Sequence, residues 1–411
     1  MDARSGESAD AAAVRAPAGD AVRRALAGDL AACRVATLAL FARVDPGLFR
    51  VQLHTGFSPL GWHLGHIAYT EALWLLDGGA AVTRPELARA FAVDGLPKAE
   101  RVGIPEPAET LDYVRRVRQA TLVRLADPAS RIDEAIWRFV LQHEAQHAET
   151  ASFLHALATR EARPSEFTPD PRPLDFVLVP AAIATIGFEG RGALDNERPA
   201  RAVELGAFEI ARYPVTQAQF AAFMADGGYR RAELWTERGW SWLSREAVER
   251  PYHWRAEAPD HPVAGVSAHE ADAFARWAGM RLPTEFEWEH AARGLVSSAG
   301  CGNFGAGNAA AIGATTPVGR FPGGRSADGA YDLLGNVWEW TASIFAPYPG
   351  FQAWPYDGYS QAWFDGLHRV LRGGSWATRS LALRPSFRNW YLPETRQILA
   401  GFRCARNGPG R

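Results

Sequence analysis

The sequence predicts an α+β protein in which a helical bundle precedes a larger domain of irregular structure. Its 411 residues are enough for two or three domains, and a hydrophobic content of 47% is enough for ordinary buried cores. Residues 19–161 are rich in Ala, Leu and Arg at helical spacing. Residues 176–411 hold 12 of the 15 tryptophans, most of the glycines, and short apolar runs broken by turn residues. This change in composition indicates two domains.

The bundle domain is predicted to contain four principal helices, near residues 19–44, 60–77, 108–126 and 132–159. Gly and Pro between them, as in Asp45-Pro46-Gly47, mark the loops. The Ala-rich start, residues 1–18, is predicted to be disordered. A helical bundle can place metal ligands in its core from facing helices.

The second half of the chain begins after a proline-rich segment. Residues 162–175 contain four prolines, which cannot continue a helix, so this segment is predicted to be a linker. The domain that follows, residues 176–411, is expected to have short strands, long loops and helices near residues 217–225 and 268–277. No internal repeat is evident in it.

The charge balance excludes some classes of partner. Lys plus Arg number 44 against 46 Asp plus Glu, so neither nucleic acid nor an anionic membrane is expected as a partner. The N-terminus does not resemble a secretory signal, and no apolar run of about 18 residues could span a bilayer. We therefore expect a cytoplasmic protein with small-molecule partners. Three scattered cysteines, Cys33, Cys301 and Cys404, are expected to be structural thiols.

Two of the predicted helices carry paired histidines. His143 and His147 are spaced i, i+4 and therefore share one helix face, while His63 and His66 lie on another helix. Three neutral imidazoles that leave open coordination positions suit iron(II) with dioxygen or zinc with water. The spacing does not decide which of His63 and His66 is the third ligand; the other one would line the site.

Residues 143–147 (HEAQH) also match the HExxH signature of zinc proteases, with Glu144 as general base. A metzincin requires Gly and His where this chain has Thr150 and Phe153, which excludes that subclass. A zinc hydrolase that uses Glu144 remains an alternative. A second alternative is a non-catalytic binding module.

The C-terminal half contains five ordered motifs: residues 208–220 (FEIARYPVTQAQF), 261–263 (HPV), 281–289 (RLPTEFEWE), 335–340 (GNVWEW) and 372–376 (RGGSW). These motifs and their order resemble the formylglycine-generating-enzyme fold, a C-type-lectin-like core. Four motif tryptophans are expected to be structural: Trp288, Trp338, Trp340 and Trp376. Residues 381–388 contain no cysteine, so oxidation of a cysteine to formylglycine is not expected.

A DinB-like four-helix bundle joined to this domain resembles the ergothioneine-type nonhaem-iron sulfoxide synthases over residues 20–406. The resemblance implies Fe(II) held by His66, His143 and His147, with O2 as co-substrate. It further implies that a sulfur or selenium donor is joined to imidazole carbon 2 of hercynine, which is N-α-trimethylhistidine. Some members have no histidine at the position of His63, which argues against that residue as a ligand.

The resemblance also assigns the hercynine-binding residues. The family motif Arg-Asn-Trp is present as Arg388-Asn389-Trp390, with Asn389 expected to bind the carboxylate and Trp390 the trimethylammonium group. Gln146, between the two histidines of one helix, matches a family residue that contacts hercynine. Its i+3 spacing from His143 makes that contact geometrically reasonable.

Three tyrosines complete the expected site. Tyr356 is assigned to assist proton or electron delivery during oxygen activation, and Tyr359 to line the substrate site. Tyr391 follows the Arg-Asn-Trp motif where thiol-using synthases commonly have Asp. A neutral phenol cannot replace a carboxylate for a cationic donor, but it can hydrogen-bond to a sugar. Tyr391, the short length and residues 63–76 (HLGHIAYTEALWLL) together make the chain most similar to the selenoneine synthases, which use a selenosugar. The alternative is a synthase that uses gamma-glutamylcysteine or cysteine.

Overall fold

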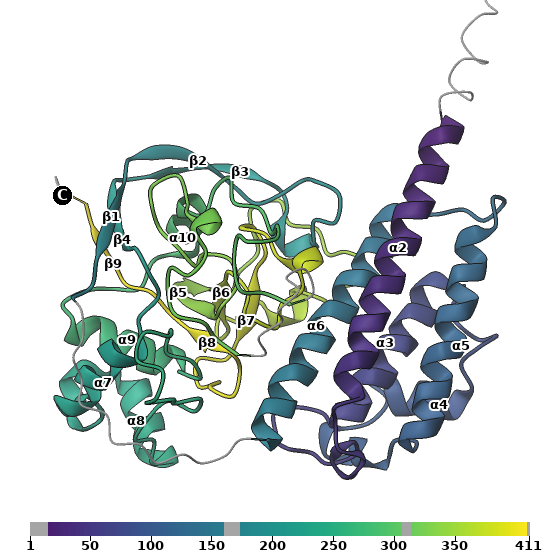
Figure 1. Cartoon of the computed structure of the whole chain (residues 1–411), viewed down its shortest axis with the longest axis horizontal. Coiled ribbons are helices and arrows are strands. Elements are labelled where there is room, and N and C mark those ends of the chain that lie inside the picture. The colour runs from purple at the N-terminus through teal and green to yellow at the C-terminus, as the bar shows by residue number, and fades with distance from the viewer. Residues whose placement is uncertain (1–14, 160–172, 306–313, 409–411) are drawn as a thin grey trace, which may run out of the picture. The chain divides into compact units, whose positions relative to one another are not determined.

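The computed structural model describes residues 15–159, 173–305 and 314–408 (Figure 1). The chain divides into two compact units, Met1–Ala158 (unit 1) and Thr159–Arg411 (unit 2). The predicted disordered start lies outside the described residues as far as residue 14, and residues 15–18 already belong to the first helix. Of the predicted linker, residues 162–172 also lie outside them, and residues 173–175 have no regular structure.

Unit 1 is a helical bundle. The four long helices are those predicted from the sequence, and a short fifth helix, α4, joins them; the bounds are α2 (Arg15–Phe41), α3 (Leu60–Leu75), α4 (Pro85–Phe91), α5 (Pro107–Ala126) and α6 (Glu134–Ala158). Helix α3 packs against α5 and α6, and α2 packs against α6. Buried apolar residues, among them Leu30, Ile67 and Val117, form the bundle core.

Two glycines let neighbouring aromatic rings approach the start of α3. A Cβ added at Gly61 would lie 2.2 Å from the ring of Phe49, and one at Gly65 would lie 2.1 Å from the ring of Phe91. Neither position could hold a larger side chain without moving those rings. This close packing fixes α3 against α4, and His66 lies next to Gly65 on that surface.

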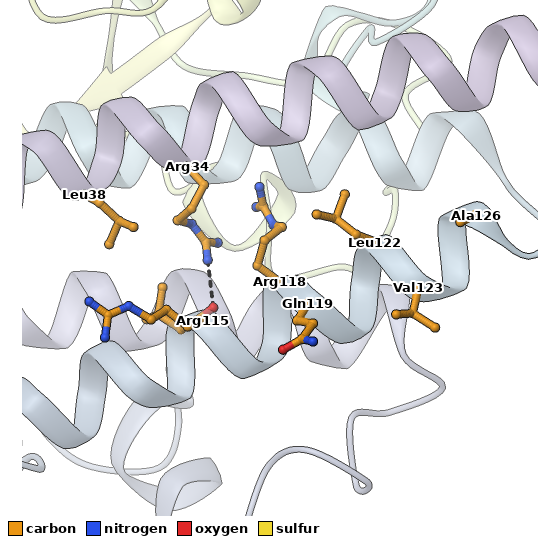
Figure 2. Close-up of a pocket in the computed structure, with 9 residues that line it drawn as sticks. Arg34, Leu38, Arg115, Arg118, Gln119, Leu122, Val123 and Ala126 are labelled. Carbon is orange, nitrogen blue, oxygen red and sulfur yellow. Dashed lines mark hydrogen bonds between the residues drawn. The ribbon is translucent and has the colours of Figure 1, made fainter.

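A surface groove of about 480 Å³ lies between α2 and α5 (Figure 2). Arg34 lines it and donates a hydrogen bond from Nη1 to the carbonyl oxygen of Val114 (3.0 Å). None of the bundle's histidines lines this groove.

Among the described residues, none of the helices combines the length and the hydropathy that a membrane-spanning segment requires.

Unit 2 is built on three small sheets with long connections. Their orders are β1-β4-β9, β2-β3 and β7-β6-β5-β8; all pairs are antiparallel except β5 with β8. The bounds are β1 (Phe176–Val179), β2 (Ala182–Ile186), β3 (Arg201–Leu205), β4 (Phe208–Ala211), β5 (Trp338–Ile344), β6 (Arg369–Arg372), β7 (Asn389–Tyr391), β8 (Ala400–Gly401) and β9 (Ala405–Asn407).

The helices of unit 2 include the two that the sequence predicts, α7 and α9, and two that it did not, α8 and α10. Their bounds are α7 (Gln217–Ala225), α8 (Glu237–Glu246), α9 (Ala268–Trp277) and α10 (Glu285–Ala291). Helix α10 begins with a capping box in which Thr284 and Glu287 satisfy each other's backbone N–H groups. It carries Trp288 into the core, where the indole N–H donates to the Glu339 carboxylate (2.7 Å).

Most of the motif tryptophans are buried, as expected for structural residues. Trp288, Trp338 and Trp340 are buried as expected, whereas Trp376 is only partly buried. All three cysteines are free thiols. The described elements therefore form a mixed α+β chain of two parts, as the sequence predicts.

Candidate metal centre and substrate site

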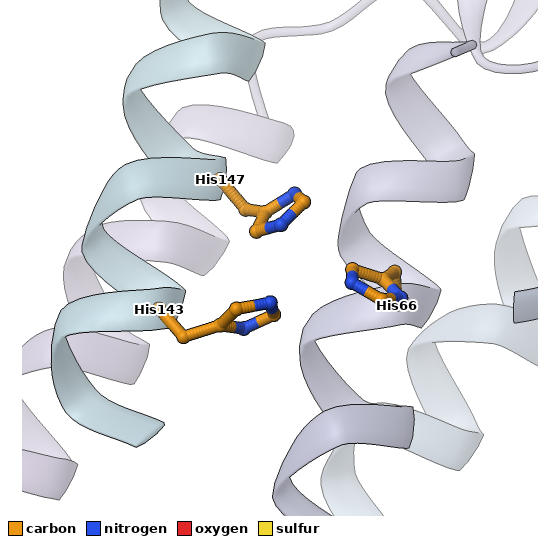
Figure 3. A group of neighbouring side chains, drawn as sticks. All are labelled: His66, His143 and His147. Atoms are coloured by element: carbon orange, nitrogen blue, oxygen red, sulfur yellow. The ribbon is translucent and has the colours of Figure 1, made fainter. Parts of the chain in front are cut away.

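The structure brings three of the predicted ligands together. His66 projects from α3 toward His143 and His147 of α6, and one ring nitrogen from each lies within 4.8 Å of the others (Figure 3). The i, i+4 spacing places the two α6 histidines on one face of that helix. His66 and His143 are buried, and His147 is partly buried.

His66 is held in one orientation by unit 1. Its Nδ1 lies 2.7 Å from the carbonyl oxygen of Phe91, which can only accept, so Nδ1 carries the proton of the neutral ring. Nε2 is then the free lone-pair nitrogen. The Trp62 indole stacks on the imidazole at 4.4 Å with an interplanar angle of 12°. Such partners fix the tautomer and the ring plane of a metal-binding histidine.

Burial keeps these imidazoles neutral. Burial, opposed by the hydrogen bond to the Phe91 carbonyl and assisted by the positive charge of Arg101, lowers the pKa of His66 to about 4. The pKa values of His143 and His147 lie well below their ordinary value, first because of burial and then because a proton on a neighbouring histidine would repel theirs. The neutral ring is the form that binds a metal ion.

His63 lies beside the cluster as a neighbour of one ligand. Its Nδ1 is 2.9 Å from Nδ1 of His147, so one ring donates and the other accepts. Nε2 of His63 and Nδ1 of His143 are buried and have no hydrogen-bond partner among the described residues. Protein groups alone therefore do not satisfy the cluster. Three neutral imidazoles with open positions fit iron(II) or zinc.

Glu144 does not face the histidines. Its buried carboxylate receives hydrogen bonds from Arg34 (3.0 and 3.1 Å), Arg118 (2.8 Å) and the Thr37 hydroxyl (2.6 Å). Although burial opposes ionisation, the two guanidinium groups hold the pKa of Glu144 well below its usual range. A carboxylate committed in this way cannot accept a proton from a metal-bound water. The zinc-hydrolase alternative, which uses Glu144 as general base, is therefore wrong.

Gln146 lies partly buried on α6, one residue before His147.

The other predicted substrate residues belong to unit 2, and three of them form one aromatic cluster. Tyr359 meets Trp390 edge-on at 6.0 Å, and Tyr356 meets Tyr359 at 6.4 Å. Trp390 stacks on Phe345 at 4.4 Å. Tyr359 is buried and Tyr356 is 40% exposed.

The Arg-Asn-Trp motif is divided between the core and strand β7. Asn389 and Tyr391 are partly buried on β7, opposite Leu371 and Arg369 of β6. Arg388 is fully buried, and its guanidinium donates to the Glu285 carboxylate (2.9 and 3.0 Å) and to two backbone carbonyl oxygens. The expectation that Arg388 binds substrate does not fit this placement, because its donors are taken by protein acceptors.

Sequence reasoning missed the groups that support the histidines. The Phe91 carbonyl leaves no signal in the sequence, since every residue has one. The buried ion cluster that contains Glu144 did leave a signal: Glu71 stands inside the apolar run of α3, and Arg34 and Arg118, which pair with both carboxylates, also lie on buried helix faces. A charge at a core position indicates a buried partner.

Comparisons with known proteins cover nearly the whole chain. The family described as Sulfatase-modifying factor enzyme 1-like domain matches residues 163–408, and the DinB superfamily matches residues 29–151. Hercynine oxygenase of Mycobacterium tuberculosis is 41% identical over 421 residues, which cover 92% of this chain and 98% of the relative. That of Mycolicibacterium thermoresistibile is 39% identical over 425 residues, 93% and 95% of the two chains.

The chain belongs to the hercynine oxygenase family. The predicted fold class, a DinB-like bundle followed by a formylglycine-generating-enzyme-like domain, is confirmed. Formylglycine-generating enzyme of M. tuberculosis is 31% identical over 272 residues, but these cover only 51% of this chain and 90% of that relative. As a member of the hercynine oxygenase family, the protein is an oxidative enzyme.

Proposed function

We propose that the protein uses iron(II) and O2 to join a chalcogen donor to imidazole carbon 2 of hercynine. The observation that carries this proposal is the buried set of three neutral histidines, His66, His143 and His147, in a member of the hercynine oxygenase family. With a thiol donor the reaction consumes one O2. The ring C–H and the S–H are replaced by a C–S bond, one oxygen atom joins the sulfur, and the other leaves as water.

Iron bound by the histidines would hold the reactants side by side and supply the redox chemistry. The chain's own groups would bind and orient. His66 presents a lone pair whose direction the Phe91 carbonyl fixes. Trp390 and Tyr359 offer aromatic surfaces, which suit a trimethylammonium group. The Asn389 amide suits a carboxylate, Gln146 would contact hercynine near the ligands, and the Tyr356 phenol would donate a proton.

We favour a sulfur donor, gamma-glutamylcysteine or cysteine, because the similar full-length relatives are named hercynine oxygenases. A selenosugar is the second candidate, and the structural feature that supports it is Tyr391. That residue is a phenol on β7 where a carboxylate would favour a cationic donor. Its side chain is partly buried.

One experiment tests the proposal. Iron-loaded protein is incubated in air with hercynine and, in turn, gamma-glutamylcysteine, cysteine and a selenosugar, and the products are identified by mass. We expect an oxygenated adduct at the hercynine ring with at least one donor. Preference for the selenosugar over both thiols would reverse the donor assignment and leave the reaction class intact.

A matched pair of variants distinguishes the loss of a clustered histidine from the loss of another histidine on α6. His143→Ala should lose bound iron and the adduct, whereas His155→Ala, a partly buried histidine of the same helix outside the cluster, should keep both. An unchanged adduct yield with His143→Ala would reject the assigned centre. No adduct from any donor with iron-loaded wild-type protein would favour a non-catalytic binding module.

A further inference from the structure

One carboxylate closes the loop that carries both candidate tyrosines. Oδ1 of Asp195 accepts a hydrogen bond from the Ser360 hydroxyl (2.5 Å), and Oδ2 accepts one from the backbone N–H of Trp354 (3.3 Å). Tyr356 and Tyr359 lie between these two anchor points. Asp195 is 1% exposed, so the closure is made inside the protein and not in solvent.

The two residues that follow Asp195 contact the segment that carries the Arg-Asn-Trp motif. Asp195 begins the short helix η3 (Asp195–Glu197), whose Asn196 donates from its side-chain nitrogen to Ser360 Oγ (2.9 Å). The carbonyl oxygen of Asn196 accepts from Arg388 (2.8 Å), the residue that precedes Asn389. Glu197 accepts from Ser386 Oγ (2.7 Å) and pairs with Arg384.

These contacts hold two segments that are joined by no strand pairing. Residues 354–360 bring Tyr359, and residues 384–391 bring Trp390, into the edge-on contact described above. Because η3 bonds to both segments, it sets the position of one aromatic ring relative to the other. An orientation error of about 1 Å at such a site can cost roughly 100-fold in rate.

We infer that Asp195 is a positioning residue for Tyr356, and that η3 as a whole holds the tyrosine loop against the Arg-Asn-Trp segment. The consequence for turnover rests on the proposed function; the holding of the loop does not. Asp195 would act through the loop and need not touch substrate. Nothing in the expected site, as read from the sequence, included this turn.

The electrostatics of the turn agree with this role. Burial and then the negative charge of Asp195 raise the pKa of Tyr356, which keeps its phenol protonated and able to donate. Burial also raises the pKa of Asp195 to about 6, although hydrogen bonds from Ser360 and Trp354 oppose that rise. The other charged neighbour of Asp195, Glu197, is paired with Arg384.

The test uses the full iron-loaded protein and two variants with a matched control. Asp195→Asn keeps the shape but can accept only one of the two hydrogen bonds, and Ser360→Ala removes one oxygen atom. Asp328→Asn is the control, because Asp328 is a mostly buried carboxylate that pairs with Arg293 and not with the loop. The measurements are amide hydrogen exchange of residues 354–360, iron content, kcat, and O2 consumed per adduct formed.

We expect at least tenfold faster exchange in residues 354–360 for both variants, with unchanged iron content. We also expect a kcat about 10 to 100-fold lower and more O2 consumed per adduct, because a displaced phenol delivers its proton poorly. A partly unfolded enzyme would lower kcat without changing the O2-to-adduct ratio. The Asp328→Asn protein should match wild type in the loop.

Two results would overturn the inference. The first is wild-type exchange in residues 354–360 for both variants, which would show that Asp195 does not hold the loop. The second is faster exchange with unchanged kcat and O2-to-adduct ratio, which would make the contact purely structural. If wild-type protein forms no adduct with hercynine, the proposed function fails, and the exchange comparison alone still decides whether η3 holds the loop.

Discussion

Burial determines the charge of the histidines at the centre of unit 1. His63 and the three ligands are packed among apolar groups, Trp62 and one another, and each pKa lies below its ordinary value. A neutral ring needs no counter-ion, and within the described residues the group that could hold a metal contains histidines only. These low pKa values make the folded state less stable at acid pH, because the histidines bind protons in the unfolded chain but not in the folded bundle.

His63→Gln should make the metal-free protein less sensitive to acid. Burial, then a proton on His66 and the charge of Arg101, lower the pKa of His63 to about 3, whereas the unfolded value is about 6.5. Stability is therefore lost as pH falls below about 6.5. Between pH 7 and 5 wild type should lose about 2 kcal/mol more than the variant.

Urea unfolding at the two pH values measures this difference. His155→Gln serves as the control. It should reduce the acid sensitivity of unfolding less than His63→Gln does, because His155 is only partly buried. Equal acid sensitivity of wild type and His63→Gln would contradict the assignment of a buried, neutral His63.

Tyr391→Asp should shift the donor preference toward gamma-glutamylcysteine and cysteine. A carboxylate on β7 would pair with the ammonium group of either thiol, which the phenol cannot do. We expect a lower KM for those donors with an unchanged KM for hercynine, measured by adduct formation under steady-state conditions. Tyr391→Phe removes only the hydroxyl and should not improve thiol use. If the KM for the thiols is unchanged in Tyr391→Asp, residue 391 does not contribute to donor binding.

Four helices of unit 1 meet at a buried ion cluster. Arg34 of α2 and Arg118 of α5 bind the carboxylates of Glu71 on α3 and Glu144 on α6. All four side chains are at most 8% exposed. Helices α3 and α6 carry the predicted metal ligands, so the ion cluster joins the two helices whose spacing would determine the geometry of the site.

Arg118→Met should destabilise unit 1 by about 3–5 kcal/mol, because it leaves two buried carboxylates with one guanidinium group. Arg116→Met, on the same helix, removes only an exposed pair with Asp112 and should change stability by less than about 1 kcal/mol. Urea unfolding of the metal-free proteins, followed by far-UV circular dichroism, provides the comparison. Similar effects of the two variants would mean that the cluster adds little to the bundle.

The sequence predicted elements better where their signals are local. Helical periodicity located α2, α3, α5 and α6 within a few residues, and the i, i+4 spacing identified two of the three clustered histidines. Helix α10 was missed although Thr284 and Glu287 form a capping box. Strand pairing was not predictable, since β4 pairs with β9 almost 200 residues later and no local pattern encodes that register.

The role of Arg388 shows the same limit at the site. Its motif suggested substrate binding, but its partner Glu285 lies 103 residues earlier in the chain. Only the folded chain reveals that pair. The aromatic contact between Tyr359 and Trp390 is likewise long-range.

At the scale of the whole molecule, the predicted functions divide between two units. All three predicted metal ligands and Gln146 belong to unit 1, and the remaining substrate candidates belong to unit 2. A metal ion that binds only the folded state stabilises the part of the chain that supplies its ligands. At 100 times its dissociation constant the gain is about 2.7 kcal/mol.

Iron(II) should therefore slow amide hydrogen exchange in α3 and α6 far more than in β5 and β6. The comparison is made anaerobically, with and without the metal, by mass spectrometry of peptic fragments. His143→Ala is the control and should show no metal-dependent protection. Equal protection in β5 and β6 would mean that unit 2 also binds the ion or is coupled to it.

His143 and Glu144 are neighbours on α6 with different partners, and this affects how a routine mutagenesis experiment should be interpreted. A Glu144→Ala enzyme is expected to lose activity because two buried guanidinium groups lose a carboxylate partner and the bundle is destabilised. The same loss of activity is what a protease hypothesis predicts for its general base. The usual inactive mutant would thus corroborate a wrong assignment made from five letters of sequence. An activity assay of this variant is informative only when a melting curve accompanies it.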